Sequence, residues 1–164
     1  MYRRKTSQQI KQKARKTLNW KITSNKRDYV VDTSAIINKF LNKLLTRGLR
    51  GRLIIPNAVI AELENLANKG QEEGFTGLEE IAKLHHYKQI KLYFSGMRPG
   101  EMQIKFARSG EIDALIREEA RKIKAILITA DLVQAKSSQA YGIQVVFLKP
   151  KIKQKKKRRF LFWR

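Results

Sequence analysis

The sequence predicts an α/β fold, in which helices flank a central parallel sheet of about four to five strands. Two observations lead to this prediction. Short apolar runs, typical of buried strands, alternate along the chain with segments whose apolar residues recur at helical spacing. Strands that are separated by helical segments favour a parallel sheet. No segment repeats internally, and the order of the strands cannot be read from this pattern.

The first part of the chain reads as two strands, each followed by a helix. A strand at 29–31 is followed by Thr33 and Ser34, either of which can cap a helix. Apolar residues at helical spacing predict that this helix continues without a break as far as Leu45. The next expected elements are a basic turn at 47–52, a strand at 53–56 closed by Pro56, and a helix at 57–70 capped by Asn57 and stopped by Gly70.

The second part continues the alternation after two glycines, Gly74 and Gly77, which are expected to interrupt the chain. The expected elements are then a helix at 78–94, a turn at 95–101, a helix at 111–124, a strand at 125–129, a helix at 132–142 and a strand at 143–148. Pro150 ends the part that is expected to be ordered.

The charge is strongly positive and unevenly distributed. The chain has 36 Lys and Arg residues against 14 Asp and Glu residues, a formal net charge of +22. Ten of the cations lie in residues 1–27 and nine in residues 149–164, and neither segment contains an acid. We therefore expect a basic N-terminal arm (1–27), a nearly balanced domain (28–150) and a basic, aromatic C-terminal tail (151–164). Such a charge indicates a polyanionic partner, nucleic acid first and an anionic membrane surface second.

The sequence also excludes several classes. It contains no cysteine, which rules out disulfides, thiol catalysis and cysteine-based zinc sites and is compatible with a reducing compartment. No apolar run approaches the roughly 20 residues that span a bilayer. No glycine-rich phosphate loop is present, and no small-molecule cofactor is expected. We expect a cytoplasmic protein without a membrane span.

Two acids stand where ligands bind in parallel α/β sheets, beyond the carboxyl ends of strands. Asp32 follows the strand at 29–31, and Asp131 follows the strand at 125–129. Two carboxylates at one sheet edge repel each other, so their joint ionisation favours a hard divalent cation such as Mg²⁺ or Mn²⁺. The alternative is that each Asp simply caps the next helix. Neighbouring hydroxyls on Thr33, Ser34 and Thr129 could cap instead and leave the carboxylates free.

The remaining acids are less specific. Asp113 lies in the first turn of its helix, where a favourable interaction with the helix dipole is the alternative explanation. Glu62 and Glu64 both border an apolar face, and periodicity does not choose between them. The other helical acids are expected on the solvated surface: Glu72, Glu73, Glu79, Glu80, Glu118 and Glu119.

Five segments together resemble a known family. "VVDTSAII", "IPNAVIAELENLANKG", "GFTGLEEIAKL", "EIDALIREEA" and "LITADLVQAKSSQAYGI" resemble a PIN domain, and more narrowly the PIN domain of archaeal ATPases that also carry a KH-type RNA-binding module. The resemblance covers about residues 28–148, in the family's order and spacing. It implies a three-layer fold and a metal-dependent nuclease site made of acidic residues.

The resemblance also implies roles for individual residues. The catalytic acids would be Asp32, Glu62 (rather than Glu64), Asp113 and Asp131; Asp32, Asp113 and Asp131 would hold the metal, and Thr33, Ser34 and Thr129 would support them. Many relatives carry a further acid shortly after the fourth, where this chain has Leu132, Val133 and Gln134. The number of metal ions, one or two, therefore stays open. The longer relatives continue into an ATPase, so this chain is either a stand-alone PIN protein or part of a longer one.

The leading functional hypothesis is a Mg²⁺- or Mn²⁺-dependent endoribonuclease that basic arms anchor on RNA. RNA as the substrate, ribosomal or structured, follows from the resemblance, and whether several copies assemble into a homo-oligomer stays open. The alternatives are a non-catalytic RNA- or ribosome-associated PIN protein and a toxin-type PIN nuclease. Cations that neutralise phosphates and aromatics that stack on bases are expected at Lys11, Lys13, Arg15, Lys16, Trp20, Lys155, Lys156, Lys157, Arg158, Arg159 and Trp163.

Overall fold

The computed structural model describes residues 27–107 and 110–150. The predicted N-terminal arm, apart from Arg27, and the predicted tail at 151–164 lie outside these residues. The nucleic-acid contacts predicted from Lys11 to Trp20 and from Lys155 to Trp163 therefore also lie outside the described part of the chain.

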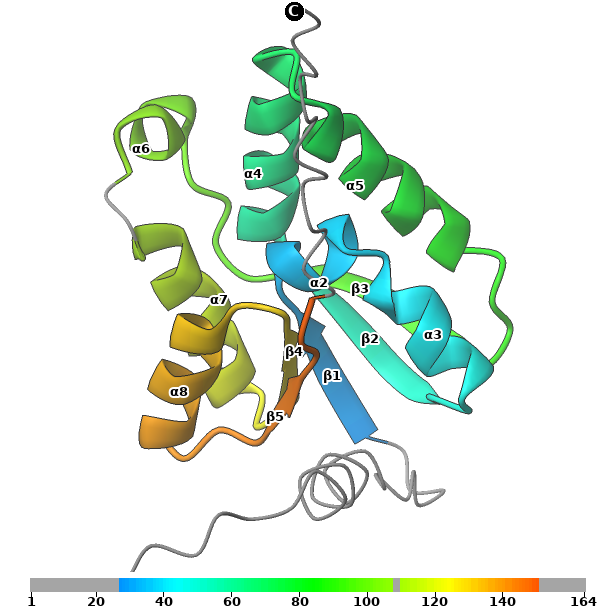
Figure 1. Cartoon of the computed structure of the whole chain (residues 1–164). Helices are drawn as coiled ribbons and strands as arrows, with labels where there is room; N and C mark the ends of the chain where they lie inside the picture. The colour runs from blue at the N-terminus through cyan, green and yellow to red at the C-terminus, as the bar shows by residue number, and fades with distance from the viewer. Residues whose placement is uncertain (1–26, 108–109, 151–164) are drawn as a thin grey trace, which may run out of the picture.

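A five-stranded, entirely parallel sheet forms the centre of the molecule (Figure 1), as the alternating pattern predicts. The strand order is β3-β2-β1-β4-β5, so β1 lies in the middle and the chain turns back once, from β3 to β4. The strands are β1 (Arg27–Val31), β2 (Gly51–Pro56), β3 (Ile90–Ser95), β4 (Ile126–Thr129) and β5 (Val145–Phe147). Because all five are parallel, their carboxyl ends share one edge of the sheet and their amino ends share the other.

Helices cover both faces of the sheet, which gives three layers. They are α2 (Thr33–Ile37), α3 (Phe40–Thr46), α4 (Asn57–Asn68), α5 (Glu72–Leu84), α6 (Glu101–Phe106), α7 (Glu111–Lys122) and α8 (Leu132–Ala140). Helix α7 contacts β1 and β4, and α8 contacts β4 and β5. In Figure 1, α7 and α8 lie on one side of the sheet, and α3 and α5 lie on the other.

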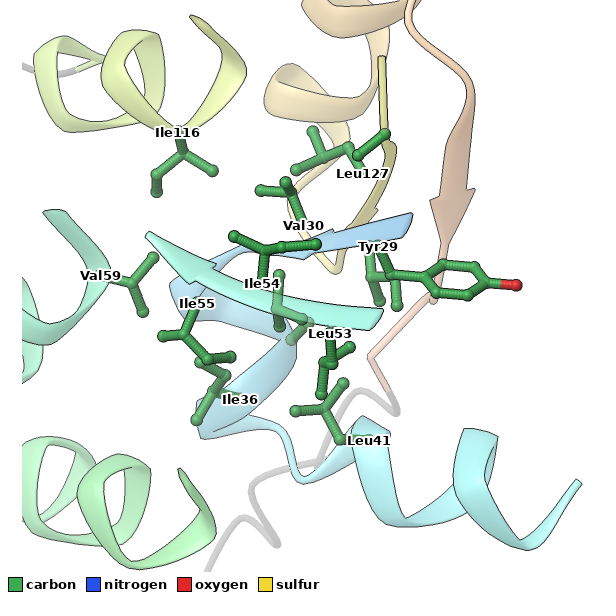
Figure 2. Packing of buried hydrophobic residues seen from close by; sticks show 14 of the residues in the cluster. Tyr29, Val30, Ile36, Leu41, Leu53, Ile54, Ile55, Val59, Ile116 and Leu127 are labelled. Carbon is green, nitrogen blue, oxygen red and sulfur yellow. The ribbon is translucent and has the colours of Figure 1, made fainter. Parts of the chain in front are cut away.

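The central strands are buried on both faces. Val30, Leu53 and Leu127 are completely inaccessible to solvent. Figure 2 shows Ile116 of α7 packing on one side of β1 and β2, while Ile36 and Leu41 pack on the other. This two-sided burial explains why the strands read as continuous apolar runs rather than as alternating ones.

The single helix predicted from residue 33 to Leu45 is wrong, because the structure divides it into α2 and α3. Lys39 adopts a left-handed backbone conformation, with φ 55°, and helical geometry cannot continue through it. The Asn38 amide donates to the carbonyl of Ser34 at 2.7 Å, which satisfies a carbonyl at the end of α2.

The interruption predicted at Gly74 and Gly77 is also wrong, since both glycines lie inside α5. A Cβ atom at Gly74 would overlap the backbone of Ala67, and one at Gly77 would overlap the side chain of Leu63. The glycines therefore allow α5 to pack closely against α4. The helix predicted at 78–94 ends at Leu84, and its last part forms the edge strand β3 instead.

Three smaller expectations also need correction. Helix α6 begins at Glu101, the last residue of the predicted turn at 95–101, and continues through residues for which no element was predicted. Asn57 is the first residue of α4 and does not cap it; its amide donates to the Gly96 carbonyl at 2.8 Å. Glu80 and Glu119 are only 5% and 7% exposed, whereas the other four helical acids are exposed as predicted. Buried Glu119 accepts a hydrogen bond from Ser95 of β3, a strand that the sequence did not reveal, and this bond partly replaces its lost hydration.

None of the helices in the described ranges has the length and apolar composition needed to cross a membrane.

Candidate functional site

The four predicted acids line one pocket of about 440 Å³ at the carboxyl edge of the sheet. They come from four separate parts of the chain: Asp32 follows β1, Glu62 lies on α4, Asp113 lies on α7 and Asp131 follows β4. The other residues that line this pocket include Thr33, Ser34, Ile37, Asn65, Leu66, Ile104 and Ile112. The lining of the pocket therefore combines acidic with apolar side chains.

Asp32 is buried, with 2% of its surface exposed, and two hydroxyls hold it in place. Ser34 donates to its Oδ2 atom, and Thr129 donates to the same atom at 2.6 Å. Its side chain makes no capping bond to α2, so the capping alternative fails for this residue. Burial raises the pKa of Asp32, although the hydrogen bonds from Ser34 and Thr129 oppose the increase.

The hydroxyls of Ser34 and Thr129 also join the loops that leave β1 and β4. Their oxygens lie 3.2 Å apart. Ser34 accepts from the backbone N–H of Ala130 at 2.9 Å, and Thr129 accepts from that of Asp131 at 3.0 Å. The position of Asp131 relative to Asp32 is therefore fixed by hydrogen bonds across the two strand ends.

Asp131 does cap the following helix, so the capping alternative holds here. Its Oδ1 atom accepts from the backbone N–H groups of Val133 at 2.6 Å and Gln134 at 3.0 Å. Capping occupies one oxygen, and the carboxylate still borders the acidic pocket. One side chain can thus stabilise α8 and contribute charge to the pocket.

Glu62, and not Glu64, faces the acidic pocket. Thr33 donates to Oε2 of Glu62 at 2.5 Å, whereas Glu64 forms an ion pair with Arg98 at the surface. Burial raises the pKa of Glu62, and the charges of Asp32 and Asp113 add to the increase. The bond from Thr33 acts in the opposite direction.

Asp113 is held through a residue that the sequence did not single out. Gln134, 1% exposed on α8, donates to the backbone carbonyl of Asp113 at 2.8 Å and accepts from Arg117 at 3.1 Å. Burial raises the pKa of Asp113, as do the charges of Asp32 and Asp131, while Arg117 lowers it. In the sequence, Gln134 is notable only as one of the residues in the region where many relatives carry a further acid, and as a residue three positions after Asp131.

The chemistry of the pocket suits a hard divalent cation. All four acids offer oxygen ligands, and mutual repulsion contributes to the raised pKa values of Asp32, Glu62 and Asp113. A cation would relieve this repulsion. In the ranges 27–107 and 110–150, no three Asp, Glu, His or Cys side chains already stand at the spacing of a metal site. The donor set therefore fits, and the acids would have to close around an ion.

A second hollow of about 460 Å³ adjoins the acidic pocket and shares Asn65 and Ile104 with it. It is lined by residues of α4, α6 and the turn between β3 and α6, including Asn68, Arg98 and Lys105. The acidic pocket thus has a neighbouring groove along α4, lined by amide, cationic and acidic side chains, the acids being Glu64 and Glu101.

Comparison with known proteins identifies the family. A sequence model of the PIN domain matches residues 29–147. An uncharacterised KH and PIN-domain containing protein of Methanocaldococcus jannaschii is 42% identical over 123 residues, which are 72% of this chain and 19% of the relative. The Holliday junction branch migration ATPase PINA of Sulfolobus acidocaldarius is 23% identical over 125 residues, 76% of this chain and 23% of that protein. The chain thus spans about a fifth of the length of these relatives.

A solved structure shows the same fold. It is a domain of a functionally unknown protein from Methanocaldococcus jannaschii, with a TM-score of 0.72 and 39% sequence identity, covering 76% of this chain and 93% of that domain. The family match spans most of the described residues, and the sheet and helices agree with it. The chain therefore belongs to the PIN domain family, whose fold is of the nuclease type.

Proposed function

We propose that this chain is a divalent-metal-dependent endoribonuclease that cleaves RNA phosphodiesters at the acidic pocket. One observation carries the proposal: carboxylates from four separate parts of the chain line a single pocket, and three of them have raised pKa values. Perturbed carboxylates that gather in one hollow are typical of catalytic sites. Membership of the PIN domain family supports the same reaction class.

The residues would divide the work as follows. Asp32, Asp113 and Asp131 would hold Mg²⁺ or Mn²⁺, which when bound activates a water molecule and stabilises charge on the phosphate. Ser34 and Thr129 keep Asp32 in position, since both donate to its Oδ2 atom. Glu62 would orient the attacking water or accept its proton, because a carboxylate with a raised pKa is a better base near neutral pH.

The surplus of cations supports a nucleic acid as the substrate. A net charge of +22 would give strong, salt-dependent attraction to a phosphate backbone with little choice of sequence. RNA rather than DNA is favoured by the relative from Methanocaldococcus jannaschii, whose name joins a KH module to its PIN domain. The cations predicted on the arm and tail would supply affinity, while the acidic pocket would supply chemistry.

A second candidate function is a non-catalytic RNA- or ribosome-associated protein on the same scaffold. One observation favours it. This chain has Leu132, Val133 and Gln134 in the region where, as the resemblance implies, many PIN nucleases carry a further acid. This candidate requires RNA binding without cleavage in any divalent metal.

The test measures the cleavage of end-labelled single-stranded and structured RNA in Mn²⁺ and in Mg²⁺. Asp32→Asn should lower the cleavage rate by at least about 100-fold and leave RNA affinity within roughly twofold, because a metal ligand is lost and no basic side chain is touched. Glu79→Gln is the control, since it makes the same carboxylate-to-amide change at an exposed position of α5 that does not line the acidic pocket.

Unchanged cleavage by Asp32→Asn would remove the proposed site. Wild-type protein that binds RNA tightly but cuts in neither metal would favour the non-catalytic candidate instead.

A further inference from the structure

The opposite edge of the sheet, where the strands begin, carries a second and chemically different hollow. It measures about 540 Å³ and lies at the amino ends of β2 and β3. Four cations and one aromatic residue line it: Arg50, Arg52, Lys88, Lys91 and Tyr93. We call these five residues the amino-end surface. Asp28 is its one acidic neighbour among the lining residues.

Most of the positive charge on this surface is not neutralised. Arg52 donates to Asp28, with Nε at 2.6 Å, and forms an ion pair with it. The other three cations, Arg50, Lys88 and Lys91, are exposed, and none forms an ion pair with an acid in the described ranges. The surface therefore has an excess of three positive charges in a single hollow.

The fold itself holds these cations together. Arg52 of β2 stands directly opposite Lys91 of β3 in the parallel register. Asp28, opposite Arg52 on β1, offsets the charge of Arg52, whereas Lys91 has no ion-pair partner within the described ranges. The turn before β2 is drawn tightly against β1 at Gly51, whose φ is 130° and where a Cβ would overlap the Arg27 carbonyl.

Tyr93 adds an aromatic face to the same side of β3. Side chains two residues apart on a strand point to the same face, so Tyr93 lies on the face of Lys91. It is 44% exposed. An exposed ring beside cations is the combination that binds unpaired nucleotides, because the ring stacks on a base while the cations neutralise phosphates.

The basic arm is attached to the domain at this edge. Strand β1 begins at Arg27, so the basic arm joins the domain at the amino edge of the sheet. Residues 1–26 contain nine Lys and Arg residues and no acid. The tail is attached after β5, which ends at the opposite edge. A polyanion bound at the amino-end surface would therefore lie at the edge of the sheet where the arm joins the domain.

We propose that the amino-end surface is a second RNA-binding site, which takes the phosphate backbone and an unpaired base of single-stranded RNA. The choice of RNA rests on the proposed function, but binding here does not require the acidic pocket to cut. Strand β1 has five residues, so the two sites lie roughly 15–20 Å apart across the sheet. An RNA strand that contacts both would be anchored at one edge while the other edge acts on it.

The first experiment compares two triple variants that remove the same charge. R50Q/K88Q/K91Q removes the three unpaired cations of the surface, and K69Q/K122Q/K136Q removes three exposed cations elsewhere. Affinity for a fluorescent 20-nucleotide oligouridine is measured in EDTA over a range of salt concentrations. The first variant should bind at least about tenfold more weakly, with a slope of log K against log salt that is shallower by about 2, whereas the control should change by roughly twofold or less.

Tyr93→Leu tests the stacking contact separately. It should weaken oligouridine binding by about fivefold with no change in salt slope, because a base contact is lost and no charge is removed. Equal losses of affinity in the two triple variants would overturn the proposal, since the surface would then contribute only general charge.

A second measurement locates the contact directly. Lysine acetylation is followed by mass spectrometry with and without oligouridine, and Lys88 and Lys91 should be protected more strongly than Lys69 and Lys136. Protection by polyglutamate but not by oligouridine would assign the surface to an acidic protein and overturn the proposal. Both measurements are made without divalent metal, so they can succeed where cleavage fails, and Asp32→Asn should behave like the wild type in both.

Discussion

The two edges of the sheet differ in the sign of their charge and in how far the charged side chains are exposed. At the carboxyl edge, Asp32 is buried and Glu62 and Asp113 are half-buried, and hydroxyls and an amide hold these three residues in place, whereas Asp131 is exposed. At the amino edge, Arg50, Lys88 and Lys91 are exposed and unpaired within the described residues. The parallel sheet keeps the two sets apart, because every strand begins at one edge and ends at the other.

This difference separates two physical tasks. Chemistry requires a fixed geometry, and the carboxyl edge accepts repulsion between carboxylates to provide it. Affinity for a polyanion requires only positive charge that can move to meet phosphates, which long exposed side chains provide. Variants at the carboxyl edge should therefore change reaction rate and pH dependence, whereas variants at the amino edge should change affinity and salt dependence.

Two glutamates on α4 provide the strongest test of this difference between the edges. Glu62→Gln should lower the rate of RNA cleavage by about 10- to 100-fold, because the side chain that borders the acidic pocket loses its charge and its basicity. Glu64→Gln should leave the rate within roughly twofold, since Glu64 faces the neighbouring groove and pairs with Arg98. Initial rates at saturating RNA give the measurement.

The two variants share a helix and a chemical change, so a general loss of helix stability would affect both. Equal rate losses in the two variants would mean that both act through the stability of α4. The position of Glu62 at the acidic pocket would then have no special role in cleavage.

The next largest effect is expected for Gln134, which donates to the backbone carbonyl of Asp113. Gln134→Leu should lower the free energy of unfolding by about 1–2 kcal/mol, because the Asp113 carbonyl and the Arg117 side chain each lose a hydrogen-bond partner. Urea unfolding provides the measurement, with Gln139→Leu at an exposed position of the same helix as control. A loss equal to that of the control would show that Gln134 does not connect α7 to α8.

The parts of the fold that sequence could predict are those set by local pattern. The strands around Val30, Leu53 and Leu127 are buried on both faces and read as apolar runs, which places Asp32 and Asp131 at the carboxyl edge. The pattern could not decide what each Asp does there. Asp131 caps α8 and Asp32 does not cap α2; Asp32 instead accepts from Ser34 and from Thr129, which lies 97 positions along the chain.

The parts that could not be predicted depend on contacts between distant segments. The edge strand β3 has only one buried residue, so its apolar pattern is weak and reads as the end of the preceding helix. Lys88 and Lys91 lie within the helix predicted at 78–94, and nothing in the sequence places the basic turn at 47–52 beside them. The amino-end surface exists only because β3 pairs with β2 and brings Lys91 opposite Arg52.

The smallest effect concerns the pH dependence of stability, which should respond to a variant at the carboxyl edge. The pKa of Asp113 is raised above its ordinary value of 3.8, so the folded state holds its proton to higher pH than the unfolded state does. The stability of the metal-free protein should therefore fall as pH rises from about 4 through the raised pKa, and level off above it.

Asp113→Asn removes one of the repelling charges and should reduce this fall, by roughly 1 kcal/mol or less because the side chain is partly exposed. Asp28→Asn, at the amino edge, should leave the fall unchanged. Urea unfolding in EDTA at pH 4, 5, 6 and 7 gives the measurement. A wild-type stability that rises steadily over this range, or an equal response in the two variants, would mean that repulsion among the acids does not govern the carboxyl edge. In that case a bound cation would relieve little repulsion, and the carboxyl edge would no longer differ from the amino edge in this respect.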